Sequence, residues 1–369
     1  MNEEEYEQAQ TAFTELGKYK DSAELVIECQ LLIDYDAALR MMDNGQFAEA
    51  ETAFTALGSY KDAAGLALEC RNTIDYNAAK QMMDNGNYAE AKAAFIALGS
   101  FRDSGAKASE CQSEIDYGIA VDIMETGDYK QAGPLFAALG SFRDSARLSV
   151  ECGNWVDYED AVALMGADNY TAALVLLEPL AEISFEDSDE LKLECTNTIS
   201  YTEADKAFED GLFYTSYKIF QSIRNFRDSG SRAELCIQAL PSTGQIYRNP
   251  DFSGSATHIK FITPKDDERP TLLKIYTTDN VHVSSVFVRS SGKFTVKLPA
   301  GNYIIKTAYG VNWFGTEEMF GDESAEYQIL KSPDGTVHFE CRRNWIWTIK
   351  LRVDSGGNVD TVKQDRDEF

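Results

Sequence analysis

The sequence has little of what marks secreted, membrane-spanning or metal-binding proteins. It holds no run of about 18 apolar residues, the length that a membrane-crossing helix needs, and its first residues, Met1-Asn-Glu-Glu-Glu, lack the basic and apolar regions of a signal peptide. Its seven cysteines include no Cys-x-x-Cys pair, which leaves zinc-ribbon and thioredoxin-like chemistry without its ligands. We therefore expect a soluble chain with no membrane span in it and no bound metal or other cofactor.

Positive charge is scarce in the first two-thirds of the chain. Residues 1–240 hold 18 Lys and Arg against 44 Asp and Glu, so this segment carries −26 of the net charge of −27. Such a surface repels phosphate backbones, which argues against nucleic acid as a partner, and it attracts a protein or peptide with a basic segment. A solvated acidic exterior that only maintains solubility is the simpler alternative.

Recognisable catalytic motifs are also lacking. The three histidines, His258, His282 and His338, do not have the His-Glu-x-x-His spacing of a zinc enzyme, and there is no Gly-x-Ser-x-Gly elbow, phosphate-binding glycine loop or dinucleotide fingerprint. These absences favour a protein that is not an enzyme. An unfamiliar site built from carboxylates of distant segments stays open as an alternative.

What the chain does have is a cysteine that returns at a nearly fixed interval. Successive members of the series are 41, 41, 41, 43 and 41 residues apart: Cys29, Cys70, Cys111, Cys152, Cys195 and Cys236. A period of this size indicates a solenoid of helical repeats, in which the cysteines are too far apart for disulfides and are expected to be buried free thiols. The first repeat lacks its leading helix, since Tyr6 aligns with Phe47. Either an N-terminal helix, with any anchor before it, has been removed, or the array is capped in another way.

Each repeat combines a short and a long predicted helix. Phe47, Ala50, Phe54 and Leu57 follow the spacing of one helical face, and Gly58 ends that short helix. An aspartate then marks the expected N-cap of the long helix, at Asp21, Asp62, Asp103, Asp144, Asp187 and Asp228. The long helix would run for about 22 residues. An aspartate or serine near its middle (Asp34, Asp75, Asp116, Asp157 and Ser200) leaves a break open there, but the lack of an accompanying Gly or Pro favours continuity.

The short helix also resembles a known helical repeat. Gly45-Gln-Phe47-Ala-Glu-Ala50-Glu-Thr-Ala-Phe54 is similar to the Gly-x-Tyr-x-x-Ala-x-x-x-Phe stretch of the tetratricopeptide repeat, and the likeness covers residues 6–240, although the period exceeds that family's usual 34 residues. The Leu-Gly-x-Tyr-Lys-Asp motif resembles tetratricopeptide-like arrays of bacterial proteins, often Gram-positive and often surface-tethered. This resemblance implies a superhelical solenoid that binds peptides or proteins on its concave face.

Two further positions of the repeat predict contacts. A cation precedes the aspartate and a glutamate precedes the cysteine, with one exception each, and pairing each cation with the glutamate of the next repeat accounts for both exceptions. We therefore expect ion pairs such as Lys61 with Glu110 and Arg143 with Glu194. A tyrosine also recurs, and its members either line a binding groove as candidate interaction residues or fill the seams between helices: Tyr35, Tyr76, Tyr117, Tyr158 and Tyr201.

After Leu240 the helical pattern gives way to a predicted β domain. Residues 241–256 are rich in turn-forming residues, as in a linker, and the alternating pattern beyond them predicts an antiparallel β-sandwich. The expected strands are 258–262, 272–278, 281–288, 294–298, 303–308, 327–330, 337–341 and 345–353. The segment Leu298-Pro-Ala-Gly-Asn-Tyr303 resembles the Leu-Pro-x-Gly-x-Tyr hairpin of prealbumin-like or carboxypeptidase-regulatory-like sandwiches.

One loop of this domain, residues 309–321, concentrates aromatic side chains between glycines. Trp313, Phe314 and Phe320 are candidate interaction residues, because exposed rings in a loop stack on a sugar or anchor a protein contact. The same rings could instead close the end of the sandwich core.

Together these patterns predict a multi-domain chain in three parts: a tetratricopeptide-like α-solenoid of six repeats over residues 1–240, a linker over 241–256 and a β-sandwich over 257–369. The leading hypothesis is a non-catalytic scaffold whose acidic solenoid binds a protein or peptide. The alternative is a surface-tethered adhesin that binds a glycan through the aromatic loop. Its location stays open between the extracytoplasmic part of a membrane-anchored bacterial protein and the cytoplasm.

Overall fold

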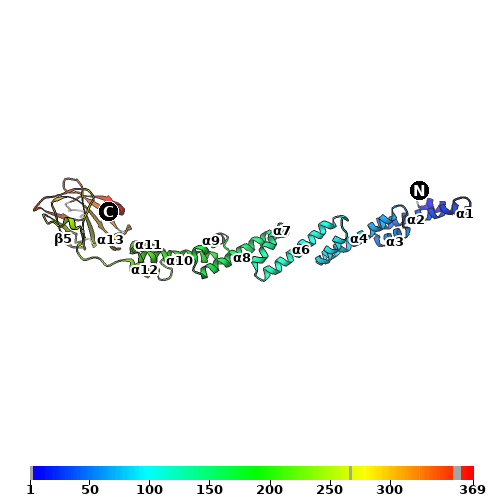
Figure 1. Cartoon of the computed structure of the whole chain (residues 1–369), viewed down its shortest axis with the longest axis horizontal. Helices are drawn as coiled ribbons and strands as arrows, with labels where there is room; N and C mark the ends of the chain where they lie inside the picture. The colour runs from blue at the N-terminus through cyan, green and yellow to red at the C-terminus, as the bar shows by residue number, and fades with distance from the viewer. Residues whose placement is uncertain (1–2, 266–267, 324, 352–358) are drawn as a thin grey trace. The chain divides into compact units, whose positions relative to one another are not determined.

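The computed structural model describes residues 3–265, 268–323, 325–351 and 359–369, and it divides into two compact units, Met1–Glu159 and Asp160–Phe369. The first unit is helical. The second begins with helices and continues, from Gly244, as β structure (Figure 1). The expected fold class, an all-α repeat region followed by an antiparallel β-sandwich, is confirmed.

Short and long helices alternate along the array, and their order can be followed in Figure 1. The short ones are α1 (Glu3–Leu16), α3 (Phe47–Leu57), α5 (Tyr88–Ala97), α7 (Tyr129–Leu139), α9 (Tyr170–Glu182) and α11 (Phe213–Ser222). In the last repeat α12 (Ser229–Cys236) takes the place of the long helix but has only 8 residues. The long ones are α2 (Ser22–Asp43), α4 (Ala63–Asp84), α6 (Ser104–Glu125), α8 (Ser145–Gly166) and α10 (Ser188–Glu209). Each long helix is continuous over 22 residues, so the open question about a break near Asp75 and its equivalents is resolved in favour of continuity.

The apolar residues of the array form separate small clusters, and each cluster joins three helices. Around Phe54, which is fully buried in α3, lie Tyr35 from the end of α2 and Cys70 from the start of α4. The second half of α4 then contributes Tyr76 to the next cluster. A long helix is therefore shared by two cores, with its first half in one and its second half in the other. Burial of each central phenylalanine stabilises its cluster by about 2 to 3 kcal/mol.

A turn with an unusual backbone joins each short helix to the next long one. Gly58 has φ +57°, as expected for a residue that ends a helix. Lys61 also has a positive φ, +48°, and the equivalent residues share it: Lys20, Arg102, Arg143, Glu186 and Arg227. A left-handed conformation costs a residue with a Cβ about 1 kcal/mol or more, so contacts made by this turn must offset that cost.

The β domain consists of two sheets, as far as the structure describes its residues. The larger follows the order β1-β4-β3-β6-β7-β10, with β8 also paired to β6, and the smaller is β5-β2-β9. The strands are β1 (Gly244–Arg248), β2 (Thr257–Ile262), β3 (Thr271–Thr277), β4 (His282–Val288), β5 (Lys293–Leu298), β6 (Gly301–Tyr309), β7 (Glu326–Leu330), β8 (Phe339–Cys341), β9 (Ile346–Lys350) and β10 (Thr361–Gln364). The sheets are antiparallel except for β2 and β9, which run parallel.

All eight expected strands are present as β2 to β9, but two strands were not predicted. β1 lies within the segment expected to be a linker, and it pairs with β4. β10 pairs with β7 near the end of the chain. The last two residues of the expected strand 345–353 lie outside the described residues.

The alternation of side chains along β3 divides the core of this domain. Leu273 and Ile275 point into the cluster between the two sheets, where they meet Ile259 and Phe261 of β2. Leu272 points to the opposite face of the large sheet and packs with the aromatic loop. The loop is therefore placed on the outer face of the large sheet.

Candidate functional site

The recurring tyrosines lie in the seams of the array. The hydroxyls of Tyr117 and Tyr201 each donate a hydrogen bond of 2.6 Å, to Asp144 and Asp228, which stand at the start of the following long helix. Tyr76 makes the same bond to Asp103 at 2.5 Å, and Tyr35 does so with Asp62. Tyr35 and Tyr76 are both only 8% exposed. The ring of Tyr158 packs edge-on against Trp155.

These bonds change the role of the aspartate that precedes each long helix. Asp62 and Asp103 stand at the N-cap position, but neither side chain bonds to a helix N–H, so the predicted capping is wrong for them. The hydrogen bond from Tyr76 holds the pKa of the Asp103 carboxyl below its ordinary value. The equivalent bond to Asp62, together with burial, raises the pKa of Tyr35 to about 12. The aspartate therefore joins two successive long helices.

The cation beside that aspartate also makes a contact other than the one expected. The ammonium of Lys61 lies 4.5 Å from the ring centre of Tyr35, and the Arg102 guanidinium lies 5.3 Å from that of Tyr76. Glu110, the predicted partner of Lys61, forms an ion pair with Lys107 of its own helix instead. The predicted pairing of Lys61 with the next repeat is therefore wrong, because the left-handed turn directs the cation back onto the preceding tyrosine.

The three aromatic residues of the 309–321 loop are buried. Trp313 and Phe314 are each 3% exposed and Phe320 is 1% exposed. Trp313 and Phe320 pack edge to face with each other, and both contact Phe287 of the sheet. In this conformation the loop completes the core, and none of the three rings offers a face to a sugar.

Phe314 lies against the last short helix of the array instead of the sheet. Its ring centre is 5.1 Å from that of Tyr214 and 5.2 Å from that of Tyr217, both in α11. Three hydrogen bonds to backbone carbonyls support the junction. The Gln238 backbone N–H donates to the carbonyl of Trp313 at 2.7 Å, and the Arg289 guanidinium donates to the carbonyls of Leu240 and Pro241. The β domain is thus docked on α11 and on the segment that follows α12.

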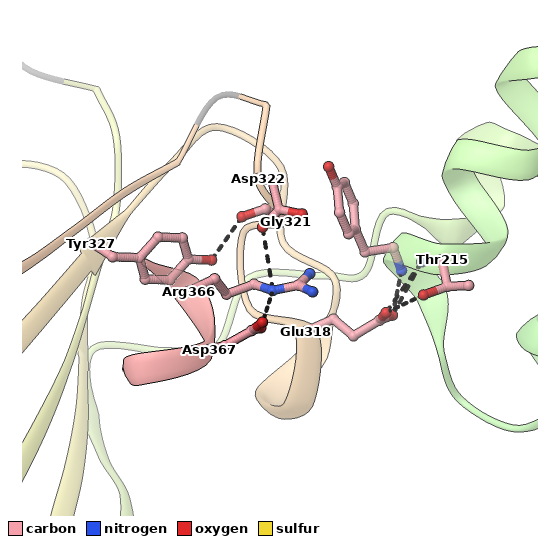
Figure 2. Close-up of polar contacts among 8 residues, drawn as sticks. Thr215, Glu318, Gly321, Asp322, Tyr327, Arg366 and Asp367 are labelled. Carbon is pink, nitrogen blue, oxygen red and sulfur yellow. Dashed lines mark hydrogen bonds and ion pairs between the residues drawn. The ribbon is translucent and has the colours of Figure 1, made fainter. Parts of the chain in front are cut away.

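A buried carboxylate is central to this junction (Figure 2). Glu318, in the short helix α13 (Gly315–Glu318), is 9% exposed and accepts hydrogen bonds from the backbone N–H of Tyr214 at 2.6 Å and from the Thr215 hydroxyl at 2.6 Å. These donors belong to the first turn of α11, whose own N-cap residue is Leu212 and has no side chain able to accept. Glu318 therefore caps a helix that lies about a hundred residues earlier in the chain.

A hollow of about 340 Å³ lies beside the junction and is lined by Asp322, Tyr327 and residues 363–367. The Arg366 guanidinium lies 3.2 Å from the Asp322 carboxylate and faces the ring of Tyr214 (Figure 2). Because basic and acidic side chains alternate around this hollow, its charge selects no ligand class.

The array presents a different kind of surface at a position that sequence reasoning missed. Two residues before the cysteine, four repeats carry an aliphatic side chain that is about 60% exposed: Ile27 (61%), Leu68 (59%), Val150 (64%) and Leu193 (60%). Two residues correspond to 200° around a helix, so this side chain lies opposite the buried cysteine. A glutamate follows each of them directly: Glu28, Glu69, Glu151 and Glu194. We call these four aliphatic residues the aliphatic row.

The signal for the aliphatic row was present in the sequence. An apolar residue that recurs out of phase with the buried face of an amphipathic helix does not reach the core, so packing in the core does not explain why it is apolar. The third and sixth repeats, with Ser109 and Glu234 at this position, interrupt the row.

The cysteine and histidine side chains that could support catalysis are buried or packed against other residues. All seven cysteines lie in the described part of the chain, are buried and form no disulfide; burial raises the pKa of the Cys70 thiol and raises that of Cys341 to about 11. The His282 ring stacks on Tyr247, and burial lowers the pKa of His282. Within the described residues no group of three or more metal-ligating side chains converges, and no helix is both long and apolar enough to cross a membrane.

Comparison with known proteins gives no relative from which a function could be transferred. The chain matches no protein-family model, no curated protein and no solved structure. The function therefore has to be argued from the surfaces described above.

Proposed function

We propose that this chain is a non-catalytic, tetratricopeptide-like scaffold that binds a protein or peptide, and that the acidic repeats form its interaction surface. The aliphatic row is the observation that supports this proposal. Water-exposed leucine, isoleucine and valine side chains repeat at one position of the long helices, each beside a glutamate. Scattered exposed apolar residues are ordinary, whereas an exposed aliphatic residue at the same position of four repeats favours a contact made by each of these helices.

The charge of the array defines the partner. Residues 1–240 carry a net charge of −26, so a second copy of the array would be repelled and a basic segment would be attracted. A partner segment with apolar side chains flanked by lysine or arginine matches both features of the row. The apolar groups would supply most of the affinity, and the charges would supply association rate and specificity.

The test is a titration of the full chain with synthetic amphipathic peptides. One peptide is built of leucine and lysine, a second of leucine and glutamate, and a third of serine and lysine. We expect tight binding of the first alone, weak and salt-sensitive binding of the third, and none of the second.

We expect no binding of the leucine-lysine peptide by a variant in which all four residues of the aliphatic row are changed to glutamine. Glutamine keeps the helix propensity and removes the apolar surface. The matched control changes four other exposed aliphatic residues of the array to glutamine: Ile96, Ile119, Val162 and Val175. Equal binding by the two variants would rule out the row as the contact surface.

A further inference from the structure

In three repeats a polar side chain of the short helix meets one of the long helix 20 residues later. Gln10 donates to Gln30 at 2.8 Å, and the Arg71 guanidinium donates to Glu51 at 2.6 Å. Lys92 donates to Gln112 in the third repeat. These pairs cover the groove between the two helices.

In the fourth repeat both positions are glycine, and the groove is open. Gly133 of α7 and Gly153 of α8 replace the polar pair, and a pocket of about 300 Å³ lies there. Its walls are formed by Tyr129, Pro134, Cys152 and Val156, with Lys130 and Asp157 at its polar edge. The helices are also close at this point, because a Cβ at Gly133 would come within 3.2 Å of the Cβ of Cys152.

The carboxylate at the edge of this pocket lacks the partner that its equivalents have. Asp34 accepts a hydrogen bond from Gln30 at 2.8 Å, and Asp116 accepts one from Gln112 at 2.6 Å. Asp157 has Gly153 in place of that glutamine, is exposed, and makes no hydrogen bond or ion pair within the described residues.

Tyr129 contributes an aromatic ring to the lining of the pocket. This ring stacks in parallel on Trp155, with 5.2 Å between their centres and 8° between their planes. A flat cation can lie on such a surface while it bonds to a carboxylate, and the guanidinium group is the side chain that does both.

We propose that the pocket of the fourth repeat binds an arginine side chain of the partner. The second repeat shows that this groove accepts a guanidinium, since its own Arg71 lies there against Glu51. The inference deepens the proposed function by naming the residue that the partner would insert, and it rests on the array being a binding surface. Lys130 also lines the pocket, and its positive charge would repel a guanidinium, so changing Lys130 to glutamine should tighten binding.

The pocket can be closed without disturbing the fold. Nothing lies within 4 Å of a Cβ placed on Gly153, so Gly153→Gln should be accommodated and should bond to Asp157, as Gln30 and Gln112 bond to their aspartates. Gly118 is the matched control, because it is another exposed glycine inside a long helix with nothing within 4 Å of its Cβ. Both substitutions should raise the thermal stability similarly, since glutamine is the better helix former.

The experiment follows the Trp155 indole and Gly153 amide resonances of the full chain during titration with N-acetyl-arginine methylamide. We expect saturable shifts in the wild type and in Gly118→Gln, and affinity lower by about tenfold or more in Gly153→Gln. N-acetyl-citrulline methylamide, which has the same shape and no charge, should not bind. The proposal would be overturned if the citrulline derivative bound as tightly as the arginine derivative. It would also be overturned if Gly153→Gln bound the arginine derivative as tightly as the wild type.

This result is independent of the aliphatic row. The four-residue row variant keeps the pocket and should bind the arginine derivative like the wild type. If that variant also keeps the leucine-lysine peptide, the proposed function of the row is wrong, while the pocket is judged by the arginine titration alone.

Discussion

At the scale of single residues, the structure assigns partners that lie far along the chain. In four repeats the aspartate that fits the local pattern of an N-cap bonds instead to a tyrosine 27 residues earlier. Both series were visible in the sequence at constant spacing. Helix propensity and capping rules describe neighbours along the chain, however, and they do not show which of two possible partners a carboxylate takes.

Substitution of Tyr117 by phenylalanine tests the tyrosine-aspartate bond. The bond holds the pKa of Asp144 below its ordinary value, so its contribution to stability is present above that value, near 3.8, and is lost as the pH falls through the lower pKa of the folded state. We therefore expect Tyr117→Phe to unfold at lower denaturant concentration than the wild type at pH 7, and the difference to shrink below about pH 4.

Denaturation of both proteins at several pH values checks this expectation. Tyr88→Phe is the control, because the Tyr88 hydroxyl makes no hydrogen bond within the described residues and its loss should change little at any pH. If Tyr117→Phe lowers the stability by the same amount from pH 7 to pH 3, ionised Asp144 is not the partner of Tyr117.

Glu318 gives a second test at this scale. Removing an N-cap side chain costs a helix about 1 kcal/mol, with a range of about 0.5 to 2, so Glu318→Ala should increase hydrogen exchange in the first turn of α11. Leu212 has the same backbone conformation, φ −85° and ψ 71°, as Asp128, φ −84° and ψ 68°, which does cap its helix. Leu212→Asn in the Glu318→Ala background should therefore restore protection of α11.

That second variant separates capping from docking. The added asparagine replaces the hydrogen bonds to α11 but not the contact between the domains, so exchange at the Trp313 loop should stay raised. Full recovery of both regions would show that Glu318 only caps the helix.

At the scale of elements, the alternation of helices and eight of the strands could be predicted, and the reason is periodicity. Short helices around Phe54 and Phe95 and strands such as β2 bury one face, so the 3.6-residue and two-residue patterns are strong. β1 and β10 show only partial burial, and their pairing depends on β4 and β7, which local patterns do not reveal. The glycine pair of the fourth repeat was likewise hidden, because two glycines in different helices form a pocket only when the helices meet.

The shared long helix leads to a prediction about cooperativity. Asp75 lies in α4 between the clusters of Phe54 and Phe95, and its side chain is exposed. Proline at this position removes a helix hydrogen bond and costs about 3 kcal/mol, so Asp75→Pro should split the unfolding of the two clusters into separate transitions. Asp75→Ala should instead stabilise the chain by a few tenths of a kcal/mol, because alanine is the better helix former.

Hydrogen exchange resolved by helix checks this. In the wild type, α3 and α5 should exchange with similar protection, and in Asp75→Pro their protection should differ. A single cooperative transition in the proline variant would mean that α4 does not couple the two clusters.

At the scale of the whole molecule, the proposed interaction surface is distinct from the aromatic loop that completes the core. The aromatic rings that the sequence offered as a binding site are buried near the junction with α11, whereas the aliphatic row lies exposed on long helices of the acidic array. Sequence reasoning correctly attached the acidic charge to the repeats. It overlooked the aliphatic row, because a single apolar residue per repeat does not alter composition or hydropathy.

Hydrogen exchange of the full chain, with and without the leucine-lysine peptide, tests the proposed binding by the repeats. We expect added protection in the first halves of the long helices that carry the aliphatic row, residues 22–29, 63–70, 145–152 and 188–195, with residues 244–369 unchanged. Added protection confined to residues 244–369 would contradict it and would place the binding surface on the β domain.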